Sequence, residues 1–324
     1  MVKGALPQSL VVFGGHHVSA DYETILLRHH GIIDLVILGE GERSLCELIR
    51  RYRSIDTVSG VAFFKDGKIL RTQPSNLLTQ EELDSIPITY GDNGFIGTPG
   101  KFDHVTYVSA RGCPLQCAFC AVGNDRIRAK SIPAVVRDIE TLLDMGFSRI
   151  AIEDNFFAHS SKRTSKICMA LAEIKKRRNG AFAWDCQTRV ESLARADTIE
   201  LMTNAGCEAV YIGVESFHPE HLAYLNKSTQ PEKYLHQLMD QVIPSLLAST
   251  IDCYLNLQFG IPGETPEHQR QTFAILETIG NLAVEHDKEI TIFGILHIRI
   301  KVVYTFRRRF LGQTYRVNQS ALSL

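Results

Sequence analysis

The chain has 324 residues, of which 44% are apolar, and its formal net charge is −1. This size supports one large domain or two modest ones, and the near-neutral charge gives no basic field for nucleic acid, so we expect no nucleic-acid partner. Eight cysteines in a chain this long do not form a disulfide framework, and no apolar stretch approaches the roughly 18 residues that a membrane span needs. We therefore expect a cytoplasmic protein with no membrane partner.

The first 75 residues alternate between strand and helix patterns, which is typical of a parallel, doubly wound (Rossmann-like) sheet. Two parallel strands with two helices cannot bury both faces of a sheet well, so we expect this region to be only part of such a domain. The predicted elements are strands at 9–13 and 32–38, helices at 21–30 and 43–52, and a short pair of strands at 60–64 and 68–71.

Residues 76–103 are richer in Pro, Gly, Asn, Asp and Ser, and they predict a linker. From residue 104 a strand–helix alternation repeats six times and predicts an α/β core domain, a partial (βα)6 barrel over 104–296, followed by a divergent tail at 297–324. Ser131 and Pro133 predict the start of the first core helix, and Gly146 its end. The predicted core strands are 104–110, 148–153, 181–187, 208–214, 251–259 and 289–296.

Three cysteines follow the first core strand, with three and then two residues between them: Cys113, Cys117 and Cys120. Three thiolates on one short loop can hold three irons of a cubane cluster and leave the fourth iron open to a cofactor. Structural zinc is the alternative, but a zinc site is closed by four ligands, and no second cysteine pair follows. The residues alone favour the cluster over zinc.

Polar residues come at the ends of the next four core strands, and the carboxyl ends of parallel strands meet at one edge of a sheet. A carboxylate such as Glu215 can accept hydrogen bonds from two ribose hydroxyls, and a turn with Gly260 and Gly263 lets the backbone approach a flat base. The simpler alternatives are that Glu153, Asp154 or Glu215 caps a helix and that the glycines only make a turn. The polar strand ends are Glu153-Asp154-Asn155, Asp185 to Arg189, Gly213 to Ser216 and Gly260 to Glu264.

Together these motifs resemble the radical S-adenosylmethionine (SAM) superfamily over about residues 104–296. The resemblance implies that the three cysteines ligate a [4Fe-4S] cluster whose fourth iron is chelated by the methionine part of SAM. It further implies roles in SAM binding for Phe119 (adenine, through its backbone), Glu153, Asp154 and Asn155 (amino group), Gln187, Glu215 and Ser216 (ribose side), and Gly260, Ile261, Gly263 and Glu264 (adenine).

A narrower resemblance links residues 12–17 and 34–42 to the end of the N-terminal domain in the cobalamin-binding branch of this superfamily. It implies that Gly14 and Gly15 lie against the nucleotide tail of cobalamin. The first half of that domain does not precede these residues, so we do not expect tight binding of cobalamin. Both ends of the chain depart from the family pattern, which predicts a truncated gene product.

The resemblance implies reductive cleavage of SAM to a 5′-deoxyadenosyl radical, which abstracts hydrogen from a small-molecule substrate, with an electron donor such as flavodoxin or ferredoxin. The sequence assigns no catalytic residue beyond the cofactor ligands. Two alternatives stay open: a cobalamin-dependent radical SAM methyltransferase, and a truncated, non-catalytic remnant that binds an iron–sulfur cluster or zinc.

Overall fold

The computed structural model describes residues 2–89, 104–122, 125–296 and 301–306. The chain divides into two compact units, Met1–Thr79 and Gln80–Leu324. Among the described helices, none combines the length and the apolar character that a bilayer crossing requires. The prediction of a tail at 297–324 falls mostly outside the described residues.

The first unit is built on a four-stranded sheet in the order β1-β2-β3-β4. Only β1 and β2 are parallel, and the other pairs are antiparallel, so the prediction of a parallel piece holds for its first half alone. The predicted helix at 21–30 is found as one helix, α3, and a short helix that the sequence did not indicate, α2, precedes it and ends before Asp21. The elements are α1 (Val2–Ala5), β1 (Val12–Phe13), α2 (His16–Ala20), α3 (Tyr22–His29), β2 (Leu35–Ile37), α4 (Glu42–Arg50), η1 (Ile55–Thr57), β3 (Val61–Lys65) and β4 (Lys68–Arg71).

Helices pack against both faces of this small sheet. One face packs Leu35, Ile37 and Phe63 with Leu48 of α4. The opposite face packs Val36 and Ala62 with helix residues such as Val18 and Leu26. Phe13 on β1 and Leu70 on β4 are exposed, and the expectation that this region is only part of a domain stays a prediction.

The second unit contains a seven-stranded sheet whose parallel strands follow one another in chain order. Successive parallel strands with helical crossovers form a curved sheet, which confirms the predicted partial (βα)6 architecture. The last strand, β13, is antiparallel to β12. The strands are β5 (His104–Tyr107), β8 (Arg149–Ile152), β9 (Ala183–Thr188), β10 (Cys207–Glu215), β11 (Asp252–Phe259), β12 (Ile290–Leu296) and β13 (Lys301–Phe306).

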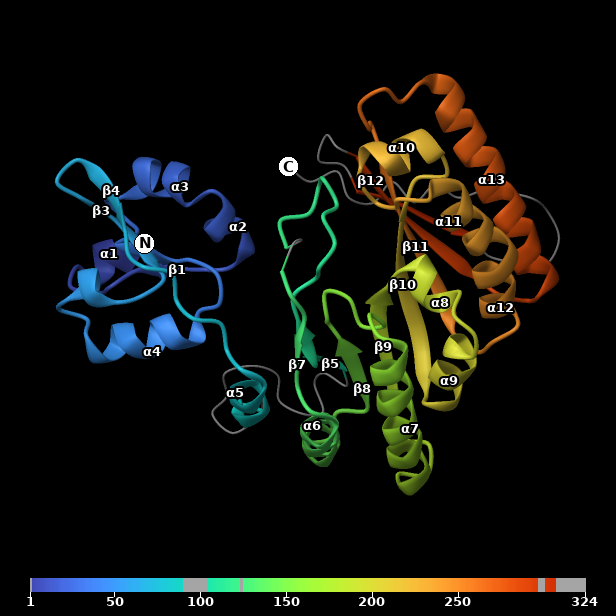
Figure 1. The fold of residues 1–324 in the computed structure, drawn as a ribbon, viewed down its shortest axis with the longest axis horizontal. Coiled ribbons are helices and arrows are strands. Elements are labelled where there is room, and N and C mark those ends of the chain that lie inside the picture. Colours follow the sequence, from blue (N-terminus) through green and yellow to red (C-terminus); the bar gives the residue numbers. More distant parts are fainter. Residues whose placement is uncertain (1, 90–103, 123–124, 297–300, 307–324) are drawn as a thin grey trace. The chain divides into compact units, whose positions relative to one another are not determined.

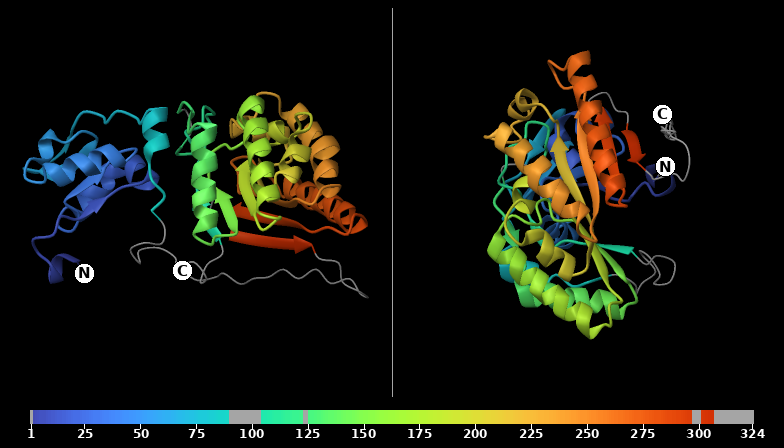
Figure 2. Two further views of the ribbon diagram at one scale, coloured as in Figure 1. Left: turned by 90° about the horizontal axis from the view of Figure 1, so that it is seen from below. Right: turned by 90° about the vertical axis from the view of Figure 1, so that its right-hand side faces the viewer.

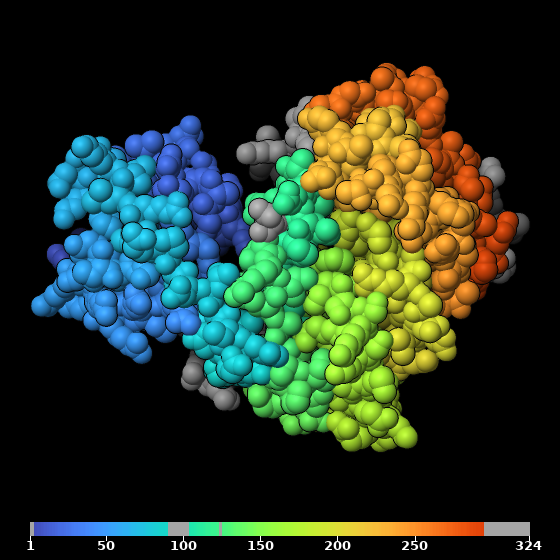
Figure 3. All heavy atoms as spheres, viewed as in Figure 1, coloured from blue at the N-terminus to red at the C-terminus, as the bar shows by residue number. Residues whose placement is uncertain are grey.

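Helices cover one face of this sheet, and Figures 1 and 2 show them lying side by side along it. Figure 3 shows the same face as a continuous surface of the segments that follow β8 to β11. Alternate strand residues such as Trp184, Ile212 and Leu255 are buried beneath them. The helices are α6 (Ile132–Asp144), α7 (Ser161–Arg177), α8 (Val190–Leu193), α9 (Thr198–Asn204), α10 (Pro219–Tyr224), α11 (Pro231–Gln237), η2 (Leu238–Val242), α12 (Ile243–Leu247) and α13 (Pro266–Glu285).

The predicted start of the first core helix is confirmed. The Ser131 hydroxyl accepts a hydrogen bond from the backbone N–H of Ala134 at 3.3 Å, and a proline stands in the first turn. Inside the predicted linker, residues Gln80–Ser85 form a further helix, α5, which the sequence did not indicate. Residues 90–103 lie outside the described residues, so the predicted domain bounds at 75, 103 and 296 stay predictions.

The predicted first core strand, 104–110, ends earlier than expected, at Tyr107. Beyond it, the backbone N–H groups of Ser109 and Ala110 donate to the carboxylate of Asp154 instead of to a neighbouring strand. The chain then turns away, and β6 (Ala110–Arg111) pairs with β7 (Arg128–Ala129) as a two-stranded ribbon. This ribbon carries the cysteine loop.

Candidate functional site: a cysteine loop at the carboxyl edge of the sheet

The three cysteines lie on one loop directly after β6. Backbone hydrogen bonds close this loop, from Cys120 to the carbonyl of Cys117 at 3.0 Å and from Asp125 to the carbonyl of Cys113 at 2.9 Å. Burial raises the pKa of the Cys113 thiol, the charges of Cys117 and Cys120 raise it further, and Arg189 lowers it. The two backbone hydrogen bonds therefore hold the three cysteines on one closed loop.

The cysteine loop is anchored to the segment that follows α10. The N–H of Ala118 donates to the carbonyl of Leu225 at 2.8 Å, and the side chain of Asn226 donates to the carbonyl of Gln116 at 2.8 Å. At the start of the loop, Gly112 has a φ of +87°, and a side chain there would meet the backbone of Arg126. Only glycine fits this close approach of two backbones.

Arg189, which follows β9, points its guanidinium at the loop. It donates to the Sγ of Cys117 at 3.7 Å, to the carbonyl of Lys227 and to the carboxylate of Glu191 at 2.9 Å. The guanidinium thus lies within hydrogen-bond reach of a sulfur atom that the loop offers as a metal ligand. The sequence placed Arg189 at a strand end but gave it no role, because Cys117 and Lys227 come from distant segments.

The residues after β8 divide into a buried group and an exposed group. Asp154 is buried, and its two oxygens accept hydrogen bonds from the backbone N–H and the hydroxyl of Ser109, both at 2.6 Å, and from the N–H of Ala110 at 2.8 Å. Glu153 and Asn155 are exposed at the sheet edge. Asp154 does not cap a helix, since the N-cap of α7 is Ser160, so the capping alternative was wrong for it.

Burial raises the pKa of Asp154 to about 6, and the hydrogen bonds from Ser109 and Ala110 oppose that shift. Gln187, on β9, is exposed next to this group and donates to the backbone carbonyl of Asp154 at 3.2 Å. The end of β5, the end of β8 and the end of β9 are thus joined by hydrogen bonds at one edge of the sheet.

Glu215, at the end of β10, forms a buried ion pair that the sequence did not reveal. Its Oε1 lies 3.0 Å from the Nζ of Lys227, and its Oε2 accepts from the Gln258 amide at 2.8 Å. The side chains of Glu215 and Lys227 are 8% and 6% exposed. This pairing excludes the helix-cap alternative for Glu215, and the N-cap of α10 is in fact His218.

The other predicted residues of this edge occupy tight turns. The Ser216 hydroxyl accepts from the N–H of His218 at 3.1 Å and lies 3.2 Å from the Nδ1 of His221. The N–H of Gly260 donates to Glu264 at 2.6 Å, and Gly260 and Gly263 both have positive φ, which supports the turn alternative for them. Ile261 is buried between the two glycines, whereas Phe119, on the cysteine loop, is 41% exposed.

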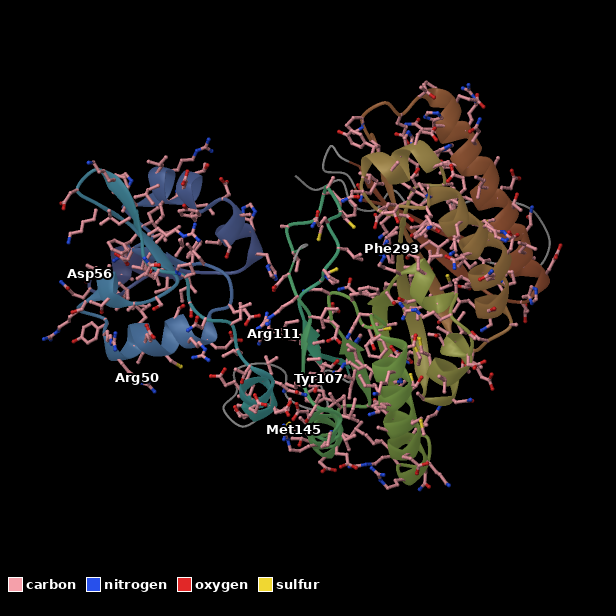
Figure 4. The ribbon with its side chains drawn as sticks, viewed as in Figure 1. Arg50, Asp56, Tyr107, Arg111, Met145 and Phe293 are labelled. Atoms are coloured by element: carbon pink, nitrogen blue, oxygen red, sulfur yellow. The ribbon has the colours of Figure 1, made fainter. Side chains whose placement is uncertain are left out.

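The sheet face opposite the helices carries a stack of aromatic rings from three neighbouring strands. Tyr211 and Tyr254 stack with their centroids 4.6 Å apart, and Phe293 lies 5.8 Å from Tyr254. Figure 4 shows the position of Phe293 in the sheet. On the same face, His104 lies 3.4 Å from Asp185, whose pKa burial raises to about 6. This half-exposed face adjoins the polar edge.

In the first unit, Gly14 and Gly15 lie exposed between β1 and α2. The carbonyl of Gly15 accepts from the hydroxyl of Ser19, and that hydroxyl in turn accepts from the N–H of Gly39. A cavity of about 300 Å³ lies beside this link, lined among others by Ser19, Tyr22 and Gly39.

Residues 107–276 match the model of the radical SAM superfamily. The chain belongs to this superfamily. The match spans the cysteine loop, the polar edge and the strands from β8 to β11, so the motif-based resemblance is confirmed. The fold of a radical SAM protein implies a [4Fe-4S] cluster and SAM as its cofactors.

Curated relatives are similar over much of this chain. An uncharacterized methyltransferase of Pyrococcus horikoshii is 28% identical over 69% of this chain and 49% of its own length. The anaerobic magnesium-protoporphyrin IX monomethyl ester cyclase of Rubrivivax gelatinosus is 27% identical over 84% of this chain and 50% of its own length. The chain thus spans about half the length of these relatives.

Among solved structures, the radical SAM methyltransferase TsrM from Kitasatospora setae, with cobalamin and a [4Fe-4S] cluster bound, aligns with a TM-score of 0.72. The alignment covers 91% of this chain and 56% of TsrM at 17% identity. This likeness confirms the fold.

Proposed function

We propose that this chain is the core of a radical SAM enzyme in which Cys113, Cys117 and Cys120 bind a [4Fe-4S] cluster. The observation that supports this proposal most directly is the cysteine loop. It holds three thiols on one closed turn, beside the guanidinium of Arg189, at the carboxyl edge of a parallel sheet. When bound, the reduced cluster and SAM supply the chemistry, a reductive cleavage that yields a 5′-deoxyadenosyl radical able to abstract hydrogen from a small-molecule substrate.

The loop fits such a cluster in its donor set and its surroundings. Each cysteine would ligate one iron, and three ligands leave one iron for SAM. Arg189 would offset part of the negative charge of the cluster, because its guanidinium already donates to the Sγ of Cys117. The anchors at Leu225 and Asn226 would hold the loop in place during electron transfer.

The polar edge would bind SAM, and the hydrogen bonds separate the roles of its residues. We assign contact with the SAM amino group to the exposed Glu153 and Asn155. The side-chain oxygens of Asp154 are occupied by Ser109 and Ala110, which supports a positioning role for Asp154 at the end of β5.

On the ribose side, Gln187 and Glu215 are the residues that we propose. A carboxylate has about four acceptor sites, so Glu215 can accept from ribose hydroxyls while it keeps Lys227 and Gln258. Ser216 is buried, and its hydroxyl is hydrogen-bonded within its own turn. We therefore assign it to holding that turn in place and not to contact with the ribose. The turn from Gly260 to Glu264 and the backbone of Phe119 would flank the adenine.

A cobalamin-dependent methyl transfer is the second candidate. The observation that favours it is the first unit, where the link from Gly15 through Ser19 to Gly39 borders a cavity. The names of the Pyrococcus and Kitasatospora relatives, both methyltransferases, agree with it. We propose electron supply by a donor such as flavodoxin or ferredoxin, in the reducing cytoplasm.

Anaerobic reconstitution with iron and sulfide, followed by electron paramagnetic resonance with and without SAM, tests the proposal. We expect about four irons per chain, a signal that changes when SAM is added, and formation of 5′-deoxyadenosine. Cys117→Ala should lose the cluster, whereas Cys46→Ala, at an exposed cysteine of the first unit, should keep it. A cluster that ignores SAM would support a non-catalytic remnant, and zinc without visible absorbance would support a zinc module; either result contradicts the enzyme.

A further inference from the structure

A cluster of histidines lies between the start of α10 and the start of α13, two helices that Figure 1 shows next to each other. The ring centroids of His218, His221 and His268 lie 4.7 to 5.2 Å from one another. One ligand atom from each of His218, Glu220 and His268 lies within 4.8 Å of the other two. Four side chains with metal-ligating atoms are thus gathered in one place.

His221 supplies the second, independent observation. Its side chain is buried, and within the part of the chain that the structure describes, its Nε2 has no hydrogen-bond partner. Leaving a buried polar atom without a partner is unfavourable, so a ligand at this nitrogen would stabilise the folded state. The other ring nitrogen, Nδ1, lies 3.2 Å from the Ser216 hydroxyl, which can accept a hydrogen bond from an N–H at Nδ1; the lone pair is then on Nε2.

The ring of His218 is fixed in the manner of a metal ligand. Its Nε2 lies 2.9 Å from the carbonyl oxygen of His268 and 3.1 Å from the hydroxyl of Thr272. A carbonyl oxygen only accepts, so Nε2 carries the proton and Nδ1 keeps the lone pair. Histidines that ligate metals donate their second ring N–H to such a partner.

We propose that His218, Glu220, His221 and His268 form a binding site for one divalent transition-metal ion of the zinc class. Imidazole and carboxylate are ligands that zinc accepts, and four protein ligands make the closed tetrahedral site typical of structural zinc. Such a site ties the start of α10 to the start of α13.

Metal binding requires a small local rearrangement. Tetrahedral zinc ligands lie roughly 3.3 Å apart, so the side chains must close in by about 1 Å or more from their present separation. For the Nε2 of His268, now 3.2 Å from Glu220, to bind the metal, the ring proton must move from Nε2 to Nδ1 by exchange with solvent, which leaves the ring neutral. The 3.3 Å contact of Nδ1 with the N–H of Thr265 must then loosen. Glu220 is exposed and can move toward the metal.

The test uses the full chain with its [4Fe-4S] cluster already reconstituted, so that the loop cysteines are occupied. Co²⁺ is titrated in as a spectroscopic probe of the zinc site, and bound metal is counted per chain. We expect one Co²⁺ with the visible absorption of a tetrahedral nitrogen and oxygen site, unchanged cluster absorbance, and displacement of the Co²⁺ by Zn²⁺.

Three variants locate the site. His268→Gln, at a partly exposed position, should weaken Co²⁺ binding by more than roughly 100-fold, and Thr272→Val, which removes a partner of His218, by roughly 10- to 100-fold. His236→Gln, at an exposed histidine of α11, should bind like the original chain. Circular dichroism checks that each variant is folded.

The proposal is overturned by any of three results. These are no Co²⁺ binding to the cluster-loaded chain, binding with thiolate-to-cobalt charge transfer, and binding that His268→Gln leaves unchanged. Because the readout is metal binding, the result does not depend on whether the chain cleaves SAM.

Discussion

Replacing Lys227 by Met should destabilise the second unit by about 3 kcal/mol. The lysine neutralises Glu215 inside the protein, where both side chains are less than a tenth exposed. Removing one partner of a buried pair costs about 3–5 kcal/mol, because it leaves an uncompensated buried charge. We expect the lower end of that range, since Gln258 still donates to Glu215 at 2.8 Å.

Urea unfolding followed by tryptophan fluorescence measures this effect. The chain has one tryptophan, Trp184, which is fully buried in the second unit and donates to the carbonyl of Ala205 at 2.9 Å. The signal therefore reports on that unit alone, and an unchanged urea dependence would show that only stability has changed. Cluster-free protein is used throughout, since a bound cofactor would stabilise the folded state.

The double variant Lys227→Met/Glu215→Gln should recover most of the loss, because removing both charges of a buried pair is often nearly neutral. The coupling between the two sites should then be about 2–3 kcal/mol. Lys176→Met, at an exposed lysine of α7, is the control and should change stability by less than about 0.5 kcal/mol. A cost below about 1 kcal/mol for Lys227→Met, or strictly additive effects in the double variant, would refute the account of a buried, paired charge.

Three further predictions concern the support of the cysteine loop and its sheet. Gly112→Ala should abolish iron loading, because its Cβ would lie 2.4 Å from the carbonyl oxygen of Arg126. Gly180→Ala, at a similar φ but with open space around it, is the control and should load iron normally. Equal iron loading of the two variants would contradict the packing argument. The pKa of Asp154, raised by burial to about 6, means that the folded state holds this proton more tightly than the unfolded state, so Asp154 should make stability fall as pH rises from about 4 to about 6. Unfolding measured across that range should show a shallower decline for Asp154→Asn, and an unchanged slope would count against the assignment. Ser131→Ala should lower the unfolding free energy by about 1 kcal/mol through loss of the α6 cap, and no loss in urea titrations would mean that the cap does not contribute.

The features that could be predicted from the sequence are those that depend on residues close together in the chain. The spacing of Cys113, Cys117 and Cys120, the apolar runs of the core strands and the cap at Ser131 each lie within a short stretch of sequence. The order of the parallel strands followed from the repeated strand–helix alternation. Because parallel strands end at a common edge, the polar strand ends could be placed together without coordinates.

The partners of those polar residues could not be predicted in this way. Lys227 stands 12 residues after Glu215, beyond a short helix, and no periodicity connects them. Glu153 and Asp154 are adjacent, yet one is exposed and the other is buried against Ser109 and Ala110. That difference depends on where β5 ends, which the three-dimensional packing decides.

Backbone strain supports the view that the edge near Glu215 serves a function. Among the described residues other than glycine, those with positive φ are Asp or Asn, with Glu215 as the exception at +70°. Asp and Asn tolerate this conformation because their short side chains bond the local backbone, whereas a longer Glu gains no such relief. Such a residue costs of order 1–3 kcal/mol and persists only when its surroundings hold it there. Lys227 and Gln258 hold the carboxylate of Glu215, and the carbonyl of Lys227 accepts from the same Arg189 that reaches Cys117. A strained, buried carboxylate linked in this way to the cysteine loop is expected where a protein positions a ligand, and not where it only completes a core.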